Sequence, residues 1–232
     1  MALTKIQRGA TSMIESIRKN ISYEEFDYQT LLDCLQNYAR PRDKISDLLR
    51  KGLVIRVKKG LYIFGDNYRR QPYSREILAN LIYGPSYISL EFALHYFGLI
   101  PEHVEAVTSV TCGRSRKFST PIGLFTYRMI PLKAFSTGMS RIELEGGRSF
   151  LMAVPEKALA DKIRADRGTV IRTQQQLYEY LVDNLRIDAA ALTDLNAEYL
   201  AEIARCYRSR KIKLLSDLVH RAIKRNKGAV YA

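Results

Sequence analysis

The chain has 232 residues, enough for one large domain or two ordinary ones, and 47% of them are hydrophobic, so a sizeable core is expected. Its 37 Lys and Arg outnumber 24 Asp and Glu, and the formal charge of +13 favours an anionic partner such as nucleic acid. No apolar run approaches the ~20 residues of a membrane-spanning helix, and the first residues lack the apolar stretch of a signal peptide, so we expect a soluble cytoplasmic protein.

The beginning of the chain carries the pattern of three helices followed by a β-hairpin. Apolar side chains recur at three- and four-residue spacing over residues 4–19, which predicts a helix. Asp27 is suited to cap a second helix, and Pro41 fits the first turn of a third helix that ends before Gly52. Two β-rich runs within residues 53–64 surround a tight turn that contains glycine. This order of elements is typical of a winged helix-turn-helix.

A polar segment at residues 65–80 separates this pattern from the rest of the chain. We therefore assign residues 1–70 to a winged helix-turn-helix DNA-binding domain and residues 71–232 to a second, mixed domain, which makes the fold class α+β. This second domain is expected to combine a small antiparallel sheet with a C-terminal helical bundle. In chain order, its predicted elements are helices at 74–82 and, capped by Ser89, at 90–97, strands at 107–111, 123–130 and 150–154, a helix opened by Pro155, and helices over 173–227.

The third helix has the two faces that a DNA-recognition helix needs. Ile45, Leu48 and Leu49 lie on one side, which can pack on the other helices while the opposite side enters a major groove. Asp43 and Asp47 on the outer face would repel phosphate, so a solvated helix or a protein-contact module is the alternative. The predicted contacts to double-stranded DNA on this helix and the wing are Arg40, Arg42, Lys44, Ser46, Arg50, Lys51, Arg56, Lys58 and Lys59.

Two further basic groups lie in the second domain. One is a loop expected between strands at residues 114–117, and the other lies near the junction of the last two helices. Each is either a secondary contact to nucleic acid or another partner, or an ordinary solvated segment. The residues concerned are Arg114, Arg116, Lys117, Arg208, Arg210 and Lys211.

A catalytic alternative rests on four charged residues of one predicted helix. Some metal-dependent nucleases place carboxylates and a lysine around Mg²⁺, and Glu156, Lys157, Asp161 and Lys162 are of these types. The plainer interpretation is a set of solvated charges on an amphipathic helix. The three cysteines form no CxxC motif and no Cys/His cluster, and no Gly-rich phosphate-binding motif is present. We therefore assign no catalytic residue, no metal and no cofactor.

Several strings in the chain resemble the AbiEi-type antitoxins. They are YISLEFAL at 87–94, YFGLIPE at 96–102, TSVT at 108–111, RKFSTPIG at 116–123 and PEKALADK at 155–162, together with the wing segment KGLVIRVKKGLY at 51–62. The resemblance covers roughly residues 21–168 and does not extend to the last ~60 residues. The wing string is common among winged helices, whereas the ordered series of later strings is more specific.

The resemblance implies an antitoxin and transcriptional regulator of a type IV toxin-antitoxin system, which acts in abortive infection against viruses. The N-terminal winged helix would repress the protein's own operon by binding operator DNA. The C-terminal domain would counter a nucleotidyltransferase-like toxin, and the two proteins need not bind each other directly.

Overall fold

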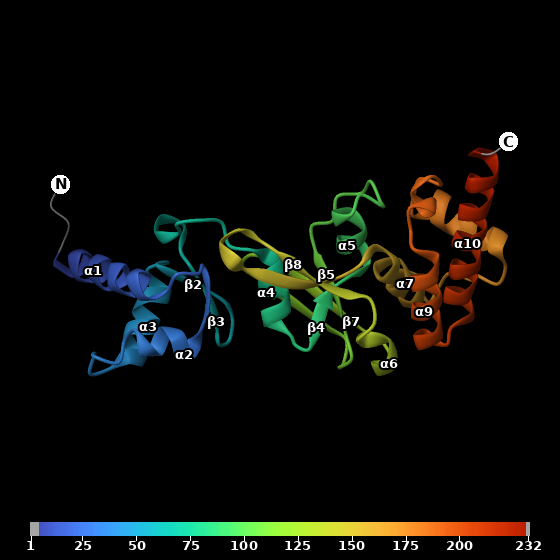
Figure 1. The fold of residues 1–232 in the computed structure, drawn as a ribbon. Coiled ribbons are helices and arrows are strands. Elements are labelled where there is room, and N and C mark those ends of the chain that lie inside the picture. The colour runs from blue at the N-terminus through green and yellow to red at the C-terminus, as the bar shows by residue number, and fades with distance from the viewer. Residues whose placement is uncertain (1–4, 231–232) are drawn as a thin grey trace. The chain divides into compact units, whose positions relative to one another are not determined.

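The computed structural model describes the backbone of residues 5–230 and the side chains of residues 12–225. The chain is a mixed α+β protein that divides into two compact units (Figure 1). Unit 1 runs to Ile82 and includes Ser119–Gly123, and unit 2 contains the remaining residues. The domain boundary expected between residues 70 and 71 lies inside unit 1.

Unit 1 contains the expected helices and the expected hairpin. The first helix was expected to begin at residue 4, which lies outside the described residues. The hairpin belongs to a three-stranded antiparallel sheet of order β1-β3-β2, whose first strand was not expected because it has only three residues. The elements are α1 (Lys5–Asn20), β1 (Glu25–Asp27), α2 (Tyr28–Asp33), α3 (Pro41–Arg50), β2 (Val54–Lys58), β3 (Leu61–Phe64), the 3-10 helix η1 (Asp66–Tyr68) and α4 (Arg75–Ile82).

Local signals determine where these helices begin and end. The Asp27 carboxylate accepts a hydrogen bond of 2.8 Å from the Thr30 N–H, which confirms Asp27 as the cap of α2. After α3, Gly52 adopts a φ of +66°, a left-handed conformation that suits glycine. Gly65 is required for a different reason, since a Cβ there would lie 2.0 Å from the Gly52 carbonyl oxygen. The absence of a side chain at Gly65, just after β3, therefore lets the backbone there lie against the backbone of Gly52, just after α3.

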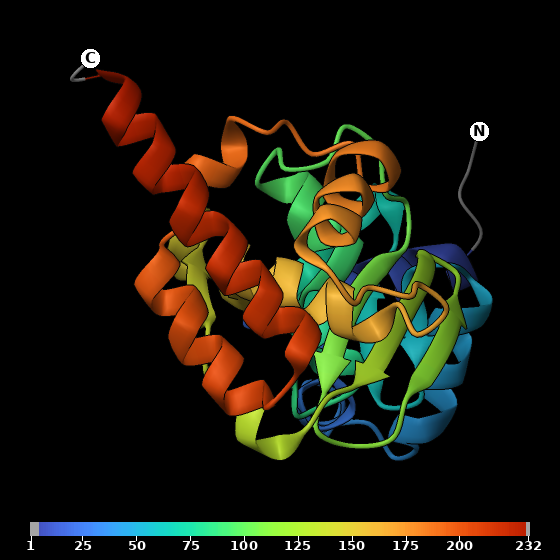
Figure 2. The same cartoon turned by 90° about the vertical axis from the view of Figure 1, so that its right-hand side faces the viewer.

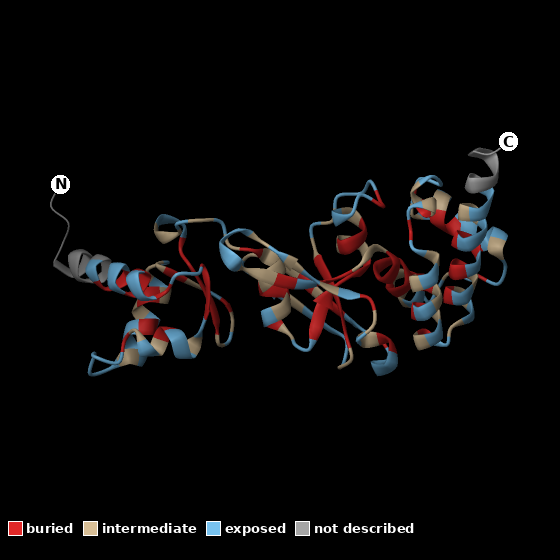
Figure 3. Ribbon diagram, viewed as in Figure 1, coloured by how far each residue is buried: buried red, intermediate tan, exposed pale blue. Residues whose placement is uncertain are grey.

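The core of unit 1 lies between its helices and its sheet (Figure 3). Apolar side chains from each of the first three helices meet aromatic side chains of the strands, and the rings of Phe26 and Phe64 are 4.7 Å apart. Because α3 contributes Ile45 and Leu48 to this core, its orientation is set by packing.

Unit 2 contains the predicted strands and helices together with short elements that were not predicted. Residues Ser119–Gly123, which join β6 to β7, are the segment counted with unit 1. The elements are β4 (Ser86–Ile88), α5 (Leu90–Tyr96), β5 (Val107–Thr111), β6 (Arg116–Thr120), β7 (Gly123–Met129), α6 (Leu132–Phe135), β8 (Met139–Glu143), η2 (Glu145–Gly147), β9 (Ser149–Ala153), α7 (Pro155–Ala165), α8 (Gln174–Glu179), the π-helical turn η3 (Tyr180–Asn184), η4 (Ala191–Thr193), α9 (Ala197–Tyr207) and α10 (Arg210–Val230).

The sheet of unit 2 is larger than expected and is mixed. Its order is β6-β7-β5-β4-β9-β8, with parallel pairs β5–β7 and β4–β9 and antiparallel pairs β4–β5 and β8–β9. The expectation of a small antiparallel sheet is therefore wrong for this part of the chain. The missed strands are either very short, as β4 is, or polar and exposed at the sheet edges, as β6 and β8 are.

The helices of unit 2 pack on the sheet and on one another. Helix α5 contacts β5 and α7, and α7 contacts α9 and α10. Figure 2 shows α9 and α10 side by side, joined at Arg208, which adopts a left-handed conformation. The expected C-terminal helices are thus present. Among the described residues, no helix combines the length and the apolar character required to cross a membrane.

Candidate nucleic-acid interface

Helix α3 presents the predicted polar face to solvent. Pro41 opens the helix, where its missing N–H leaves no donor unpaired, and Ile45 and Leu48 are buried on the inner side. The predicted contacts that are exposed on and just before this helix are Arg40, Arg42, Lys44, Ser46 and Arg50. The ammonium of Lys44 lies 5.6 Å from the ring centroid of Tyr38, so a cation–π contact orients this side chain.

Ion pairs within α3 neutralise one of its two carboxylates. Asp47 lies 2.5 Å from the guanidinium of Arg50 and 2.7 Å from the ammonium of Lys51. Hydrogen bonds from Lys51 and then from Arg50 hold the pKa of Asp47 below its ordinary value. Such surface pairs are worth at most about 1 kcal/mol, so Arg50 and Lys51 can exchange Asp47 for a phosphate at little cost. Asp43 stays exposed on the same helix.

Ser46 makes a local bond. Its hydroxyl donates to the backbone oxygen of Arg42 at 3.1 Å, one helical turn earlier. While this bond is kept, the Ser46 oxygen is available to another group only as an acceptor, and the hydroxyl would have to rotate in order to donate elsewhere.

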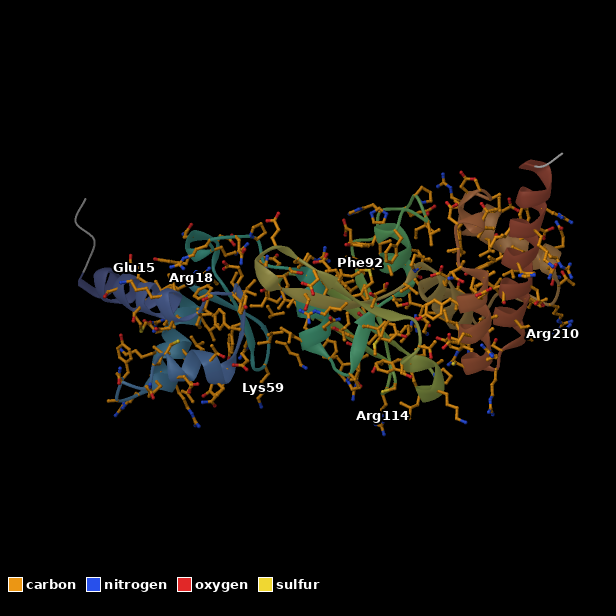
Figure 4. All side chains as sticks on the ribbon, in the orientation of Figure 1. Glu15, Arg18, Lys59, Phe92, Arg114 and Arg210 are labelled. Carbon is orange, nitrogen blue, oxygen red and sulfur yellow. The ribbon has the colours of Figure 1, made fainter. Side chains whose placement is uncertain are left out.

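The turn between β2 and β3 carries fewer free cations than the sequence predicts. Arg56 and Lys59 are exposed, and Figure 4 shows Lys59 projecting from this turn. In contrast, the ammonium of Lys58 donates to the backbone oxygen of Ile82 at 2.6 Å and is partly buried. The prediction that Lys58 is a free phosphate contact is therefore corrected, because its charge is directed to the end of α4.

The sequence matches no protein-family model and no curated protein.

The first basic group of unit 2 is not a loop throughout. Arg114 is exposed and precedes the strand, as Figure 4 illustrates, but Arg116 and Lys117 belong to β6. Because β6 is an edge strand of the six-stranded sheet, its charged side chains are those expected to discourage edge-to-edge pairing. The structure thus provides a structural role for Arg116 and Lys117 beside the predicted binding role.

The second basic group is divided by the structure. Arg208 ends α9 and Arg210 begins α10, and both are exposed along a groove of about 790 Å³ that Arg205 and Lys213 also line. Lys211 does not line this groove. Its ammonium donates to the backbone oxygens of Asp166 at 3.3 Å and Thr169 at 2.6 Å, so it holds the segment after α7.

Glu156, Lys157 and Asp161 of α7 are buried, which contradicts the expectation of solvated charges for these three residues. Lys157 and Asp161 are completely buried and form an ion pair one helical turn apart. Asp161 also accepts hydrogen bonds from the hydroxyls of Ser89, at 2.6 Å, and Tyr207. Ser89 occupies the predicted capping position of α5, but its hydroxyl is directed to Asp161 instead of the helix N–H groups.

This buried network connects α7 to its neighbours. Lys157 donates to the Tyr207 hydroxyl at 2.7 Å, and burial lowers the pKa of Lys157 while the adjacent Asp161 opposes that shift. Burial, and then the charge of Asp161, raise the pKa of Tyr207. Glu156 is also buried and accepts from the Asn196 N–H at 2.7 Å. The i, i+4 spacing of Lys157 and Asp161 is the sequence signal for the pair.

Lys162 differs from Glu156, Lys157 and Asp161, with which it was grouped in the catalytic alternative. It is only partly buried and lies 2.8 Å from Glu91 and 3.0 Å from Asp166. Within the described part of the chain, no group of three or more His, Cys, Asp or Glu residues is arranged to hold a metal ion.

Proposed function

We propose that unit 1 binds double-stranded DNA as a winged helix-turn-helix, with α3 in the major groove and the β2–β3 turn beside the flanking backbone. The observation that carries this proposal is the charge distribution on α3. Arg40, Arg42 and Lys44 are exposed and have no carboxylate partner among the described residues, whereas Asp47 is neutralised within the helix. An anionic ligand would therefore meet unpaired cations on α3, a helix whose position is fixed by its packing in the core of unit 1.

The turn supports the same proposal. Arg56 and Lys59 offer charges that can contact phosphates without reading sequence, while arginines of α3 have the geometry to read guanine. Such a division predicts two separable effects of mutation, one on sequence preference and one on general affinity.

A more specific role is proposed on the sequence resemblance alone. The protein would repress its own operon through operator DNA, and its C-terminal residues would counter a nucleotidyltransferase-like toxin in a type IV system that defends against viruses. The exposed cations Arg208 and Arg210 on the α9–α10 groove are the surface we assign to the second activity, since they have no ion-pair partner in the described structure.

The buried network gives less support to the alternative of a metal-dependent nuclease. Such an enzyme needs its carboxylates where a DNA strand and a metal ion can reach them. In this structure Asp161 is completely buried and paired with Lys157, and Glu156 is bonded to the backbone of Asn196. These contacts support a structural role for the three side chains.

The experiment is a salt series of binding to the duplex upstream of the gene, with a scrambled duplex as competitor. We expect sequence-preferring binding whose log affinity falls with log salt by about 0.9 for each phosphate contact. Arg42→Ala should reduce both affinity and preference, and Lys19→Ala, an exposed lysine at the end of α1, is the matched control. Equal binding of both duplexes by the unaltered protein would overturn operator recognition.

A further inference from the structure

A pocket of about 540 Å³ lies in unit 2 where two parallel strands end. β5 and β7 are parallel neighbours, and the residues that follow them, Cys112 and Ile130, line this pocket. The carboxyl ends of parallel strands are where open α/β sheets bind ligands, and the volume is within the range of small-molecule sites. We call it the arginine pocket, because Arg128, Arg164 and Arg167 contribute its charge.

The three arginines come from separate elements and are not neutralised. Arg128 is near the end of β7, Arg164 is in the last turn of α7, and Arg167 follows that helix. All three are exposed, and none forms an ion pair in the described part of the chain. Three unneutralised guanidinium groups around one cavity repel each other, so a bound anion would relieve that repulsion.

The carboxylate nearest to these arginines in sequence, that of Asp166, already has other partners. Asp166 lies between Arg164 and Arg167 in sequence, but it is held by Lys162 at 3.0 Å and by the Tyr180 hydroxyl at 2.5 Å. The backbone oxygen of Asp166 is bonded by Lys211. An ion pair with Asp166 therefore does not explain why Arg164 and Arg167 lie at this pocket.

The pocket also has an apolar side. Met129 and Leu132, which are 55% and 72% exposed, line it together with the arginines. Large apolar side chains left open beside guanidinium groups suit a ligand with a flat ring at one end and a charged group at the other. From these observations we propose that the arginine pocket binds a nucleoside phosphate, with the phosphates on the arginines and the base on Met129 and Leu132.

This proposal is independent of duplex binding by unit 1, because no residue of α3 takes part. The shared chemistry of a nucleoside phosphate has two sources, a free nucleotide and the phosphorylated end of a nucleic-acid strand. The probes are therefore ATP and a short single-stranded oligonucleotide with a 5′-phosphate, each compared with its form lacking phosphate.

Cys112 reports occupancy of the arginine pocket directly. The full-length protein is alkylated with iodoacetamide, and each cysteine is followed by peptide mass spectrometry, with Cys34 in unit 1 as the internal reference. At a ligand concentration ten times Kd the free site falls to about one-tenth, so alkylation of Cys112 should slow about tenfold. Adenosine should protect weakly, and tripolyphosphate should bind less tightly than ATP. Equal protection by adenosine, or equal binding of tripolyphosphate, would overturn the two-ended ligand.

Substitutions test the assignment to these arginines. Arg164→Gln or Arg167→Gln should weaken binding about tenfold or more, since each removes a charge-assisted bond from an exposed position. The matched control is Arg141→Gln, an exposed arginine of β8 that pairs with Glu143 at 3.2 Å. Arginine-dependent binding of ATP identifies a free nucleotide, and such binding of the oligonucleotide alone identifies a strand end. The proposal is wrong if neither ATP nor the phosphorylated oligonucleotide binds. It is also wrong if Arg164→Gln and Arg167→Gln bind the probe as well as the control Arg141→Gln does. Arg42→Ala should leave this binding unchanged, which separates it from the duplex experiment.

Discussion

Arg18 of α1 and Glu24, just before β1, form a buried ion pair with 2.5 Å between guanidinium and carboxylate. The guanidinium also donates to the backbone oxygen of Tyr23 at 3.0 Å, and the same carboxylate oxygen accepts from the backbone N–H groups of Arg70 and Gln71 at 3.2 Å. Burial lowers the pKa of Arg18, and Glu24 opposes the shift. One pair thus connects the first helix, the first strand and the segment after the hairpin.

Breaking this pair should destabilise the protein. Glu24→Gln removes the carboxylate charge and leaves a buried guanidinium without its counter-ion, at an expected cost of about 3–5 kcal/mol in the free energy of unfolding. Urea unfolding measures the loss. Glu15→Gln is the control, because Glu15 lies on the same helix as Arg18, α1, but is exposed (Figure 4). Equal stabilities of the two variants would contradict a structural role for the pair.

The pair in α7 should behave as a coupled unit. Lys157→Met leaves Asp161 buried without a counter-charge, so we expect a loss of about 3–5 kcal/mol. Adding Asp161→Leu removes the buried carboxylate that has lost its counter-charge, so the double variant should be more stable than Lys157→Met alone. Lys162→Met, on the same helix but only partly buried, should cost much less. Additive losses in urea unfolding would show that the two side chains act independently.

The cap of α2 predicts a pH dependence. The backbone N–H of Thr30 holds the pKa of Asp27 below its ordinary value, so the carboxylate adds stability above the unfolded pKa of about 3.9. That contribution is lost as the pH falls through the lower pKa of the folded state. Asp27→Ala should therefore cost about 1 kcal/mol at neutral pH and progressively less in acid. Asp33→Ala at the other end of the helix provides the comparison, and a cost independent of pH would argue against the charged cap.

The two lysines of the β2–β3 turn should differ in DNA binding. Lys59→Ala removes an exposed charge and should lower affinity on all sequences while reducing the salt slope by about 1. Lys58→Ala should change the slope less, because the Lys58 ammonium is bonded to Ile82, and it should instead reduce stability. Fluorescence anisotropy over a salt series distinguishes them. A larger effect of Lys58 on the slope would mean that its bond to Ile82 opens when DNA binds.

The arrangement of helices and hairpin in unit 1 followed from the sequence, because its signals act over a few residues. The Asp27 cap, Pro41 at the start of α3 and Gly52 after it each bias the backbone next to them, and the apolar spacing of α3 identified its buried face. Seven of the nine predicted DNA contacts are exposed, whereas Lys51 is paired with Asp47 and Lys58 is bonded to Ile82. That these residues bind DNA stays a prediction.

Features that depend on partners far along the chain were decided only by the tertiary structure. Alternation identifies a strand but not its neighbour, so the parallel pairing of β5 with β7 was missed. A charged side chain is expected in water unless a partner compensates its burial, and the partners of Asp161 include Ser89, 72 positions away, and Tyr207, 46 positions away. The arginine pocket has the same origin, since only folding brings Arg128 of β7 to the end of α7.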